Sequence, residues 1–428
     1  MLQKNSKIFL SLSFLLASVF LLSCKKDNYS VVSQQRIIIW TSCSEFAQYV
    51  EFFNSLHEDV KAVLVYKENP ALSLPPAKDE LPPDIVISSY LASDSVNKNF
   101  RRLDYFFDNG VLSSDIFYEQ LLKAGKKGRN QYLFPVSFNL PLIIFSEENR
   151  SLVNENYILS PLEIKNISEQ YNQKDSKGGY SKIGFTPLSN EEFLYLVAKL
   201  YRANFRAEKN LVAWNGFDLK TAADFLRNWT NSVNGSSQTE EDFAFKYLFM
   251  PYYRQVTSGR TLFAYSTSDV FFKLTHEQEL SLDFRWIAKD NMLPLEDSFV
   301  MLGISREAQN IVGATEFISW FFNSENQKLI LERKERMKLE TDLFGIAGGF
   351  SSLENVTEHI LPVFYKNLFT NIPSSQLLTV PQKLPARWES YRTLVVEPYI
   401  KNYIKTPEEE LPVSIENFEK EWQKKGFD

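Results

Sequence analysis

The chain has 428 residues, of which 44% are hydrophobic, and its 47 basic and 53 acidic residues give a formal net charge of −6. A mildly acidic, evenly mixed surface excludes a dedicated nucleic-acid-binding protein, because phosphate recognition needs a basic face. The length exceeds what one hydrophobic core usually serves, so we expect two lobes.

The chain opens with the pattern of a secretory signal. Two lysines precede an uncharged apolar stretch at 8–22, and a further lysine pair follows at 25–26. A membrane-spanning helix needs about 20 apolar residues, and this run is shorter and contains serines. We therefore predict a cleaved signal rather than a transmembrane anchor.

The stretch Leu-Leu-Ser-Cys that ends at Cys24 resembles a bacterial lipobox. This resemblance implies a signal peptide at 1–23, lipidation of the Cys24 sulfur and a polar tether at 24–32, on a protein that faces the periplasm or the cell exterior. The alternative is an ordinary signal peptide with an unmodified cysteine. Cleavage removes two lysines, leaving a charge of −8. Cys43 is then the only thiol, which excludes an internal disulfide, and we expect it to be a small buried residue.

The first elements alternate between strand and helix. A β-rich apolar run at 36–40 is followed by residues with helical spacing. Ser42 and Glu45 have the spacing of a capping box, which predicts that the helix begins there. Further strands are predicted at 61–66 and within 82–90. This alternation is typical of a parallel sheet covered by helices.

Later segments continue the pattern. An extended apolar segment at 131–149 enters a new unit, and a buried strand is predicted at 297–305 before a helical region with a stripe of Phe317, Trp320 and Phe321. The remaining predictions are helices at 191–205 and 219–229 and surface loops at 172–180 and 231–240.

Five segments together resemble the extracellular solute-binding proteins of ABC importers, in the maltose-binding-protein-like class. They are 82–90, 134–149, 258–269, 299–331 and 380–395. The resemblance implies an α/β fold of two lobes, each a mainly parallel sheet flanked by helices, with a ligand cleft between them.

The same resemblance implies the lobe boundaries. The N-terminal lobe takes 33–140 and 292–335, and the C-terminal lobe takes 141–291 and 336–428. Ligand capture is then a hinge closure favoured by contacts with both lobes.

Ligands of open α/β sheets lie beyond the carboxyl ends of the strands. The candidate ligand-binding residues at such positions are Trp40, Thr41, Ser88, Tyr90, Phe138, Asn139, Tyr265, Asp269 and Trp388. The resemblance places Trp388 where the family carries a stacking tryptophan, and it also supports Asn139 and Asp269. Aromatic plates with amide, hydroxyl and carboxylate groups suit a sugar, which has C–H faces and a hydroxyl edge.

Structural roles compete with these assignments. Trp40 could be the last core residue of its strand, and Trp388 could pack between helices. Asp269 occupies a position where sugar-binding relatives often carry an aromatic residue. Trp214 could cover the cleft, although packing within a lobe is the stronger interpretation.

We found no catalytic constellation, metal-ligand spacing or cofactor motif, and we expect a protein that is not an enzyme. The expected function is lipid-anchored capture of a sugar or related solute and its delivery to an ABC importer permease, by a monomer with no nucleic-acid partner. The main alternative is an anchored two-lobed interaction protein or adhesin whose cleft is filled, for which the 35 phenylalanines offer material. A lipid-anchored glycosidase is a weaker alternative, because Glu191 and Glu192 are adjacent on a helix and point apart.

Overall fold

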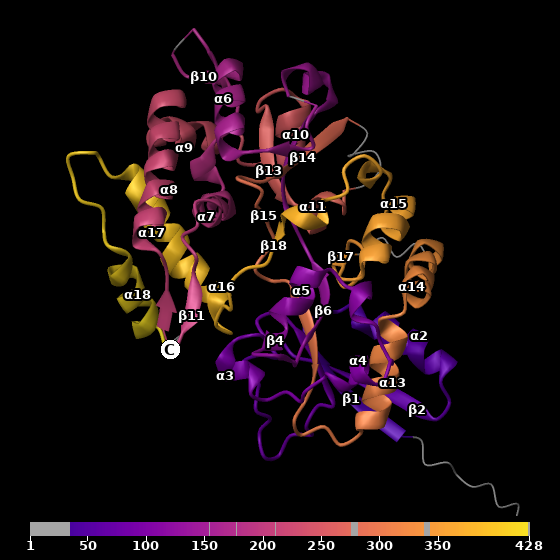
Figure 1. The fold of residues 1–428 in the computed structure, drawn as a ribbon. Coiled ribbons are helices and arrows are strands. Elements are labelled where there is room, and N and C mark those ends of the chain that lie inside the picture. Colours follow the sequence, from indigo (N-terminus) through magenta and orange to yellow (C-terminus); the bar gives the residue numbers. More distant parts are fainter. Residues whose placement is uncertain are drawn as a thin grey trace, which may run out of the picture.

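A computed structural model describes residues 35–153, 155–176, 178–209, 211–274, 281–337 and 343–426. The predicted signal peptide, the tether and the lipidation site Cys24 lie outside the described residues. Within the described ranges, every helix is too short or too polar to cross a membrane. Figure 1 shows two parts, a lower lobe built on one sheet and an upper lobe built on another.

The sheet of the first lobe has six strands in the order β17-β6-β16-β3-β1-β2. The parallel half confirms the predicted start of the chain, with Ile39 of β1 opposite Leu64 of β2 and Ile85 of β3. The other three strands pair antiparallel. The strands are β1 (Gln35–Thr41), β2 (Val60–Tyr66), β3 (Ile85–Ser88), β6 (Phe134–Phe138), β16 (Val300–Ile304) and β17 (Phe350–Ser351).

Aromatic side chains hold the helices on this sheet. The Phe53 ring of α2 (Phe46–Leu56) lies 5.1 Å from that of Phe317 on α13 (Ile311–Phe321), so the predicted aromatic stripe is core. The capping box was wrong, because α2 begins at Phe46 and Glu45 forms no side-chain cap. The other elements here are α3 (Asp94–Asn97), α4 (Tyr105–Asp108), α5 (Glu119–Ala124), β4 (Lys126–Lys127), β5 (Asn130–Gln131), α14 (Ser324–Met337) and α15 (Leu361–Phe364).

The sheet of the second lobe has the order β13-β7-β14-β8 and is mainly antiparallel. The expected mainly parallel arrangement is therefore wrong for this lobe, and the first sheet is mixed, with two parallel and three antiparallel pairings. In the second lobe, the reason is that β7 enters from the first lobe, whereas β13 runs back to the crossing, where Ser268 N–H donates to Leu140 O (2.9 Å). The strands are β7 (Pro141–Ser146), β8 (Ile158–Leu159), β13 (Phe263–Thr267) and β14 (Leu282–Ile287).

A layer of helices packs beside this sheet (Figure 1). Both predicted surface loops carry structure, since 172–180 contains β9 and the start of β10, and α9 begins at Ser237 after Ser236 Oγ accepts from Thr239 N–H (3.1 Å). The helices are α6 (Pro161–Tyr171), α7 (Glu191–Leu200), α8 (Gly216–Asn228), α9 (Ser237–Lys246), α10 (Tyr252–Thr257), α11 (Ser268–Phe271), α16 (Trp388–Tyr391), α17 (Glu397–Lys405) and α18 (Ile415–Lys424). The short strands are β9 (Gln173–Lys174), β10 (Tyr180–Lys182), β11 (Arg206–Glu208), β12 (Leu211–Ala213), β15 (Leu293–Pro294) and β18 (Leu378–Thr379).

One expected lobe boundary differs from the structure. Because β17 pairs with β6, the chain around Phe350 belongs to the first sheet, whereas the sequence assigned all of 336–428 to the second lobe. The chain between β17 and β18 also contacts the second lobe, because Trp286 Nε1 of β14 donates to Asn371 O (2.8 Å). Local periodicity could not show the place of β17, because a two-residue strand carries no periodic signal.

Glu240 is fully buried in the second lobe, where it accepts hydrogen bonds from Leu188 N–H (2.9 Å) and Asn234 Nδ2 (2.8 Å). Burial raises the pKa of Glu240 from 4.5 to about 7. The protonated form is thus favoured in the folded state, and the stability it contributes is present below about pH 4.5 and is lost as pH rises through about 7. The difference between the pKa values of Glu240 in the unfolded and folded states corresponds to about 3 kcal/mol of the free energy of unfolding.

We therefore expect the melting temperature to fall between pH 5 and pH 8 and Glu240→Gln to reduce that fall. The remainder is due to Glu296 and Glu397, whose pKa values burial also raises to about 7. Calorimetric melting at several pH values measures it. Glu421→Gln, on the exposed face of α18, is the matched control and should keep the wild-type slope. An unchanged slope in Glu240→Gln would show that Glu240 is not the titrating group.

Candidate functional site

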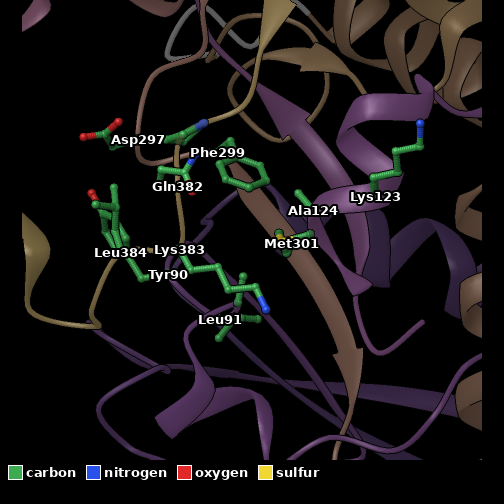
Figure 2. Close-up of a pocket in the computed structure, with 12 residues that line it drawn as sticks. Tyr90, Leu91, Lys123, Ala124, Asp297, Phe299, Met301, Gln382, Lys383 and Leu384 are labelled. Carbon is green, nitrogen blue, oxygen red and sulfur yellow. The ribbon is translucent and has the colours of Figure 1, made fainter. Parts of the chain in front are cut away.

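A cavity of about 140 Å³ lies between the two lobes. Tyr90 and Leu91 line it from the end of β3, Met301 lines it from β16, and Phe299 lies directly before that strand (Figure 2). The segment 381–384 lines it from the second lobe. A second cavity of about 80 Å³ shares Asp297 and most of that segment. Both are smaller than the roughly 300 Å³ of a typical ligand pocket. The chain at 379–384, which we call the cleft segment, therefore partly fills the cleft in this conformation.

Asp297 is the polar centre of the cleft. It is 4% exposed, and its Oδ2 accepts from the Tyr195 hydroxyl and from Trp388 Nε1, both at 2.6 Å. Its Oδ1 pairs with Lys199 Nζ at 2.8 Å, and Lys199 also donates to Leu295 O. A buried carboxylate needs such partners, because an unpaired charge in the interior is very unfavourable. Asp297 thus ties the crossing segment before β16 to α7 and α16 of the second lobe.

Tyr90 makes a direct bridge between the lobes. Its backbone has φ of +61°, a left-handed conformation that is strained for a residue other than glycine and is frequent at ligand sites. Its hydroxyl donates to Glu389 Oε2 (3.1 Å) of the second lobe. Burial and the nearby Glu389 carboxylate raise the pKa of Tyr90 well above its ordinary value, so it stays a neutral donor.

Acidic groups gather behind this bridge. Burial raises the pKa values of Glu296 and Glu397 to about 7. Arg392 offsets them in part, because it pairs with Glu389 (2.6 Å) and Glu397 (3.4 Å). Asp297 is the only carboxylate among the described residues that line the two central cavities, and these other acidic groups do not line them.

Among the predicted ligand residues, the structure brings Tyr90 alone to the central cavity. Trp40, Thr41 and Ser88 lie at the ends of β1 and β3, but each is at most 4% exposed. The Lys67 ammonium covers the Trp40 ring at 4.5 Å from its centroid. Trp40 is thus a core residue in this conformation.

Of the four predicted residues at the lobe crossing and in or after β13, Asn139 organises the crossing. Asn139 Nδ2 donates to Gly348 O (2.8 Å), and its Oδ1 accepts from Ser268 Oγ (2.6 Å). Phe138 and Tyr265 are buried among other rings. Asp269 is half-buried and accepts from Thr267 Oγ1 (2.6 Å).

Trp388 is fully buried and presents no ring face to the cleft. It packs against Tyr195 (5.8 Å) and Phe205 (5.5 Å) within the second lobe. The expected stacking plate is therefore not available in this conformation. Trp214 likewise packs within that lobe, 6.3 Å from Phe205.

Sequence reasoning did not single out Asp297, Lys199 or Tyr195. The sequence did contain one signal for Asp297, since the acidic pair Glu296 and Asp297 stands between two apolar segments, the second of which is the buried strand β16. Among the described residues, no group of His, Cys, Asp and Glu is arranged to hold a metal ion. Cys43 is half-buried, and burial raises the pKa of its thiol to about 12, which makes it a poor nucleophile.

Comparison with known proteins gives structural matches only: no protein-family model and no curated protein matches the chain. The sugar-binding protein MalE from Xanthomonas citri matches with a TM-score of 0.61 and 12% identity, covering 92% of this chain and 96% of that one. The chain has the two-lobed fold of the maltose-binding proteins.

Two proteins from Listeria monocytogenes give similar matches. The maltose-binding periplasmic protein MalE in complex with maltose has a TM-score of 0.60 at 13% identity, covering 92% of this chain and 98% of its own. An ABC substrate-binding protein in complex with cycloalternan has a TM-score of 0.59 at 14% identity, covering 92% and 100%. The predicted two-lobed α/β architecture is confirmed, and the maltose-binding-protein fold extends over nearly the whole chain.

Proposed function

We propose that this protein captures a sugar or related small solute between its lobes and delivers it to an ABC importer permease. The observation that carries the proposal is the maltose-binding-protein fold along 92% of the chain, together with a cavity lined from both lobes. Two of the named structural neighbours are in complex with cycloalternan and maltose, and the third is a sugar-binding protein.

The chemistry of the cavity supports a sugar. The rings of Tyr90 and Phe299 offer aromatic surface for the C–H faces of a pyranose. Gln382, Lys383 and Asp297 offer hydrogen-bonding groups for its hydroxyls. Polar groups at the edge of an aromatic patch fix the orientation of a ligand that is itself amphipathic.

Capture requires a conformational change, because the present cavities are too small for a sugar chain. The cleft segment has to move or the lobes have to separate, and the crossing strands offer the hinges. A ligand that contacts both lobes then favours the closed state by its differential affinity.

A panel of neutral and charged sugars tests the proposal through thermal melting. A ligand at 100 times its dissociation constant stabilises the protein by about 2.7 kcal/mol, which moves the melting temperature by a few degrees. A shift from at least one sugar is the expected result. If no solute in a broad panel raises the melting temperature, the protein is not a solute-binding protein of this kind.

The cleft segment between the lobes favours a second candidate function. Because the cleft segment fills space between the lobes, the protein could serve as an anchored interaction module that binds no small solute. The same melting panel separates the two functions, since this candidate predicts no shift for any sugar.

We further propose that Cys24 carries the lipid anchor. Firm membrane attachment needs more than one acyl chain, and Cys24→Ala removes the sulfur that starts their attachment. The variant should therefore move from the membrane fraction to the soluble fraction. Cys43→Ala is the matched control and should remain membrane-bound. Membrane fractionation after expression in a lipoprotein-processing bacterium measures both, and an unaltered distribution of Cys24→Ala would contradict the anchor.

A further inference from the structure

A larger groove, of about 470 Å³, lies beside the central cleft at the level of α18. The first lobe contributes one wall through Ser93–Ser95, and the second lobe contributes the others through the β11–β12 hairpin and α18. The volume falls within the range of small-molecule sites, unlike the central cavities. The groove contains none of the ligand residues predicted from the sequence.

Trp422 gives the groove an oriented aromatic surface. Its ring packs edge-on against Tyr391, with centroids 5.3 Å apart and planes at 80°. Its Nε1 donates to Ser390 Oγ (2.9 Å), which fixes the rotation of the indole. The side chain is half-buried, and the part that remains open lines the groove. A fixed, partly open indole is a suitable plate for a sugar ring.

Positive charge exceeds negative charge along the groove. Lys209, Lys383 and Arg387 line it, against Asp94 and Glu419. Asp94 is already engaged, because it pairs with Lys127 (3.4 Å) and Lys383 (3.9 Å).

Two of these cations keep their charge available. Arg387 donates to the backbone oxygen of Gly426 (3.4 Å), a neutral acceptor. Over the described ranges, neither Arg387 nor Lys209 has a carboxylate within ion-pair distance. Glu419 accepts from the Tyr391 hydroxyl (3.4 Å), and burial raises the pKa of that carboxyl, which weakens it as a counter-charge.

We propose that this groove is a separate binding site for an acidic saccharide. The sugar ring lies on Trp422, and its carboxylate or sulfate group meets Arg387 and Lys209. Charge complementarity selects the anionic sugar over a neutral one, because charge-assisted hydrogen bonds are the strong ones. The groove lies beside the cleft of the proposed function and shares Lys383 with it, but Trp422, Arg387 and Lys209 line the groove alone.

Titration calorimetry with trigalacturonate tests the proposal, with its methyl ester as an uncharged probe of the same backbone. The wild type should bind the acid and bind the ester at least tenfold more weakly. Arg387→Gln and Lys209→Gln should each weaken binding of the acid about tenfold. Raising the salt concentration from 0.05 M to 0.5 M should weaken the binding of the acid to the wild type, because Arg387 and Lys209 are partly exposed and salt screens their charge.

Arg206→Gln is the matched control, since Arg206 lies on the same hairpin but pairs with Glu208 outside the groove. It should bind like the wild type, and all variants should keep the wild-type melting temperature. The proposal is overturned if trigalacturonate does not bind, if the ester binds equally well, or if the two groove variants bind like Arg206→Gln. If Tyr90→Ala weakens the binding of trigalacturonate and the groove variants do not, the acid binds in the central cleft, and the proposal is also overturned.

Discussion

Asp297→Ala is expected to lower the free energy of unfolding by about 3–5 kcal/mol, because it leaves the buried Lys199 ammonium without its carboxylate. The Tyr195 hydroxyl and the Trp388 N–H lose their acceptor in the same step. The Lys199 and Asp297 side chains are only 12% and 3% exposed, so water cannot replace the lost partner fully. Urea unfolding followed by tryptophan fluorescence measures the loss.

Asp297→Asn separates charge from hydrogen bonding. The amide oxygen can still accept from the Tyr195 hydroxyl and Trp388 Nε1, and only the charge opposite Lys199 is lost, so we expect a smaller loss of unfolding free energy, about 2 kcal/mol. Glu51→Ala is the matched control, because Glu51 lies on the exposed face of α2, pairs with Arg333 at the surface (3.1 Å), and should cost far less stability. If Asp297→Ala costs no more than Glu51→Ala, the Asp297 cluster does not hold the lobes as described.

Trp388→Ala has the second large effect that we expect, a loss of about 3–5 kcal/mol in the free energy of unfolding. The indole is fully buried and packs on three rings, and its removal leaves a cavity beside Asp297. Chemical denaturation and melting measure the loss.

Trp388→Phe distinguishes a structural residue from a ligand-stacking residue. It keeps most of the packing and loses the hydrogen bond to Asp297, so a measurable loss of stability is expected. Trp214→Ala is the matched control, with a smaller cost because Trp214 is only half-buried. Wild-type stability with lost sugar binding in Trp388→Phe would contradict the packing role and restore the stacking plate.

The start of the fold was predictable because its signals are local. The apolar run of β1, the helical spacing after it and the next two strands each occupy a continuous window, and the structure places them in one parallel set. The aromatic stripe around Phe317 was predictable for the same reason. Family resemblance supplied the two-lobed architecture that these windows could not give.

The direction of the second sheet and the place of β17 were not predictable from such windows. Strand direction in that sheet depends on where the chain re-enters from the other lobe, and β17 is held by β6, which lies more than 200 residues earlier in the sequence. Periodicity reports which face of an element is apolar, and it carries no information about the partner.

The candidate site shows the same limit at the level of single residues. From its sequence position alone, Trp388 could be a ligand plate or a core residue. Its hydrogen-bond acceptor, Asp297, lies 91 residues away in the sequence. Tyr90 was predicted from its place after β3, where the end of a strand is a local signal. Strand-end position alone did not decide the outcome, because Trp40, Thr41 and Ser88 also lie at strand ends and are buried away from the cavity.

We expect a sugar bound between the lobes to contact Tyr90 and Gln382. Titration calorimetry with the most stabilising neutral sugar of the melting panel measures its affinity for the wild type, Tyr90→Ala and Gln382→Ala, with Gln238→Ala, at an exposed position of α9, as control. We predict a dissociation constant near micromolar, about −8 kcal/mol, weakened at least tenfold by either cleft variant and unchanged by the control. Equal affinity in all four proteins, or no binding to the wild type, would show that no sugar binds against Tyr90 and Gln382.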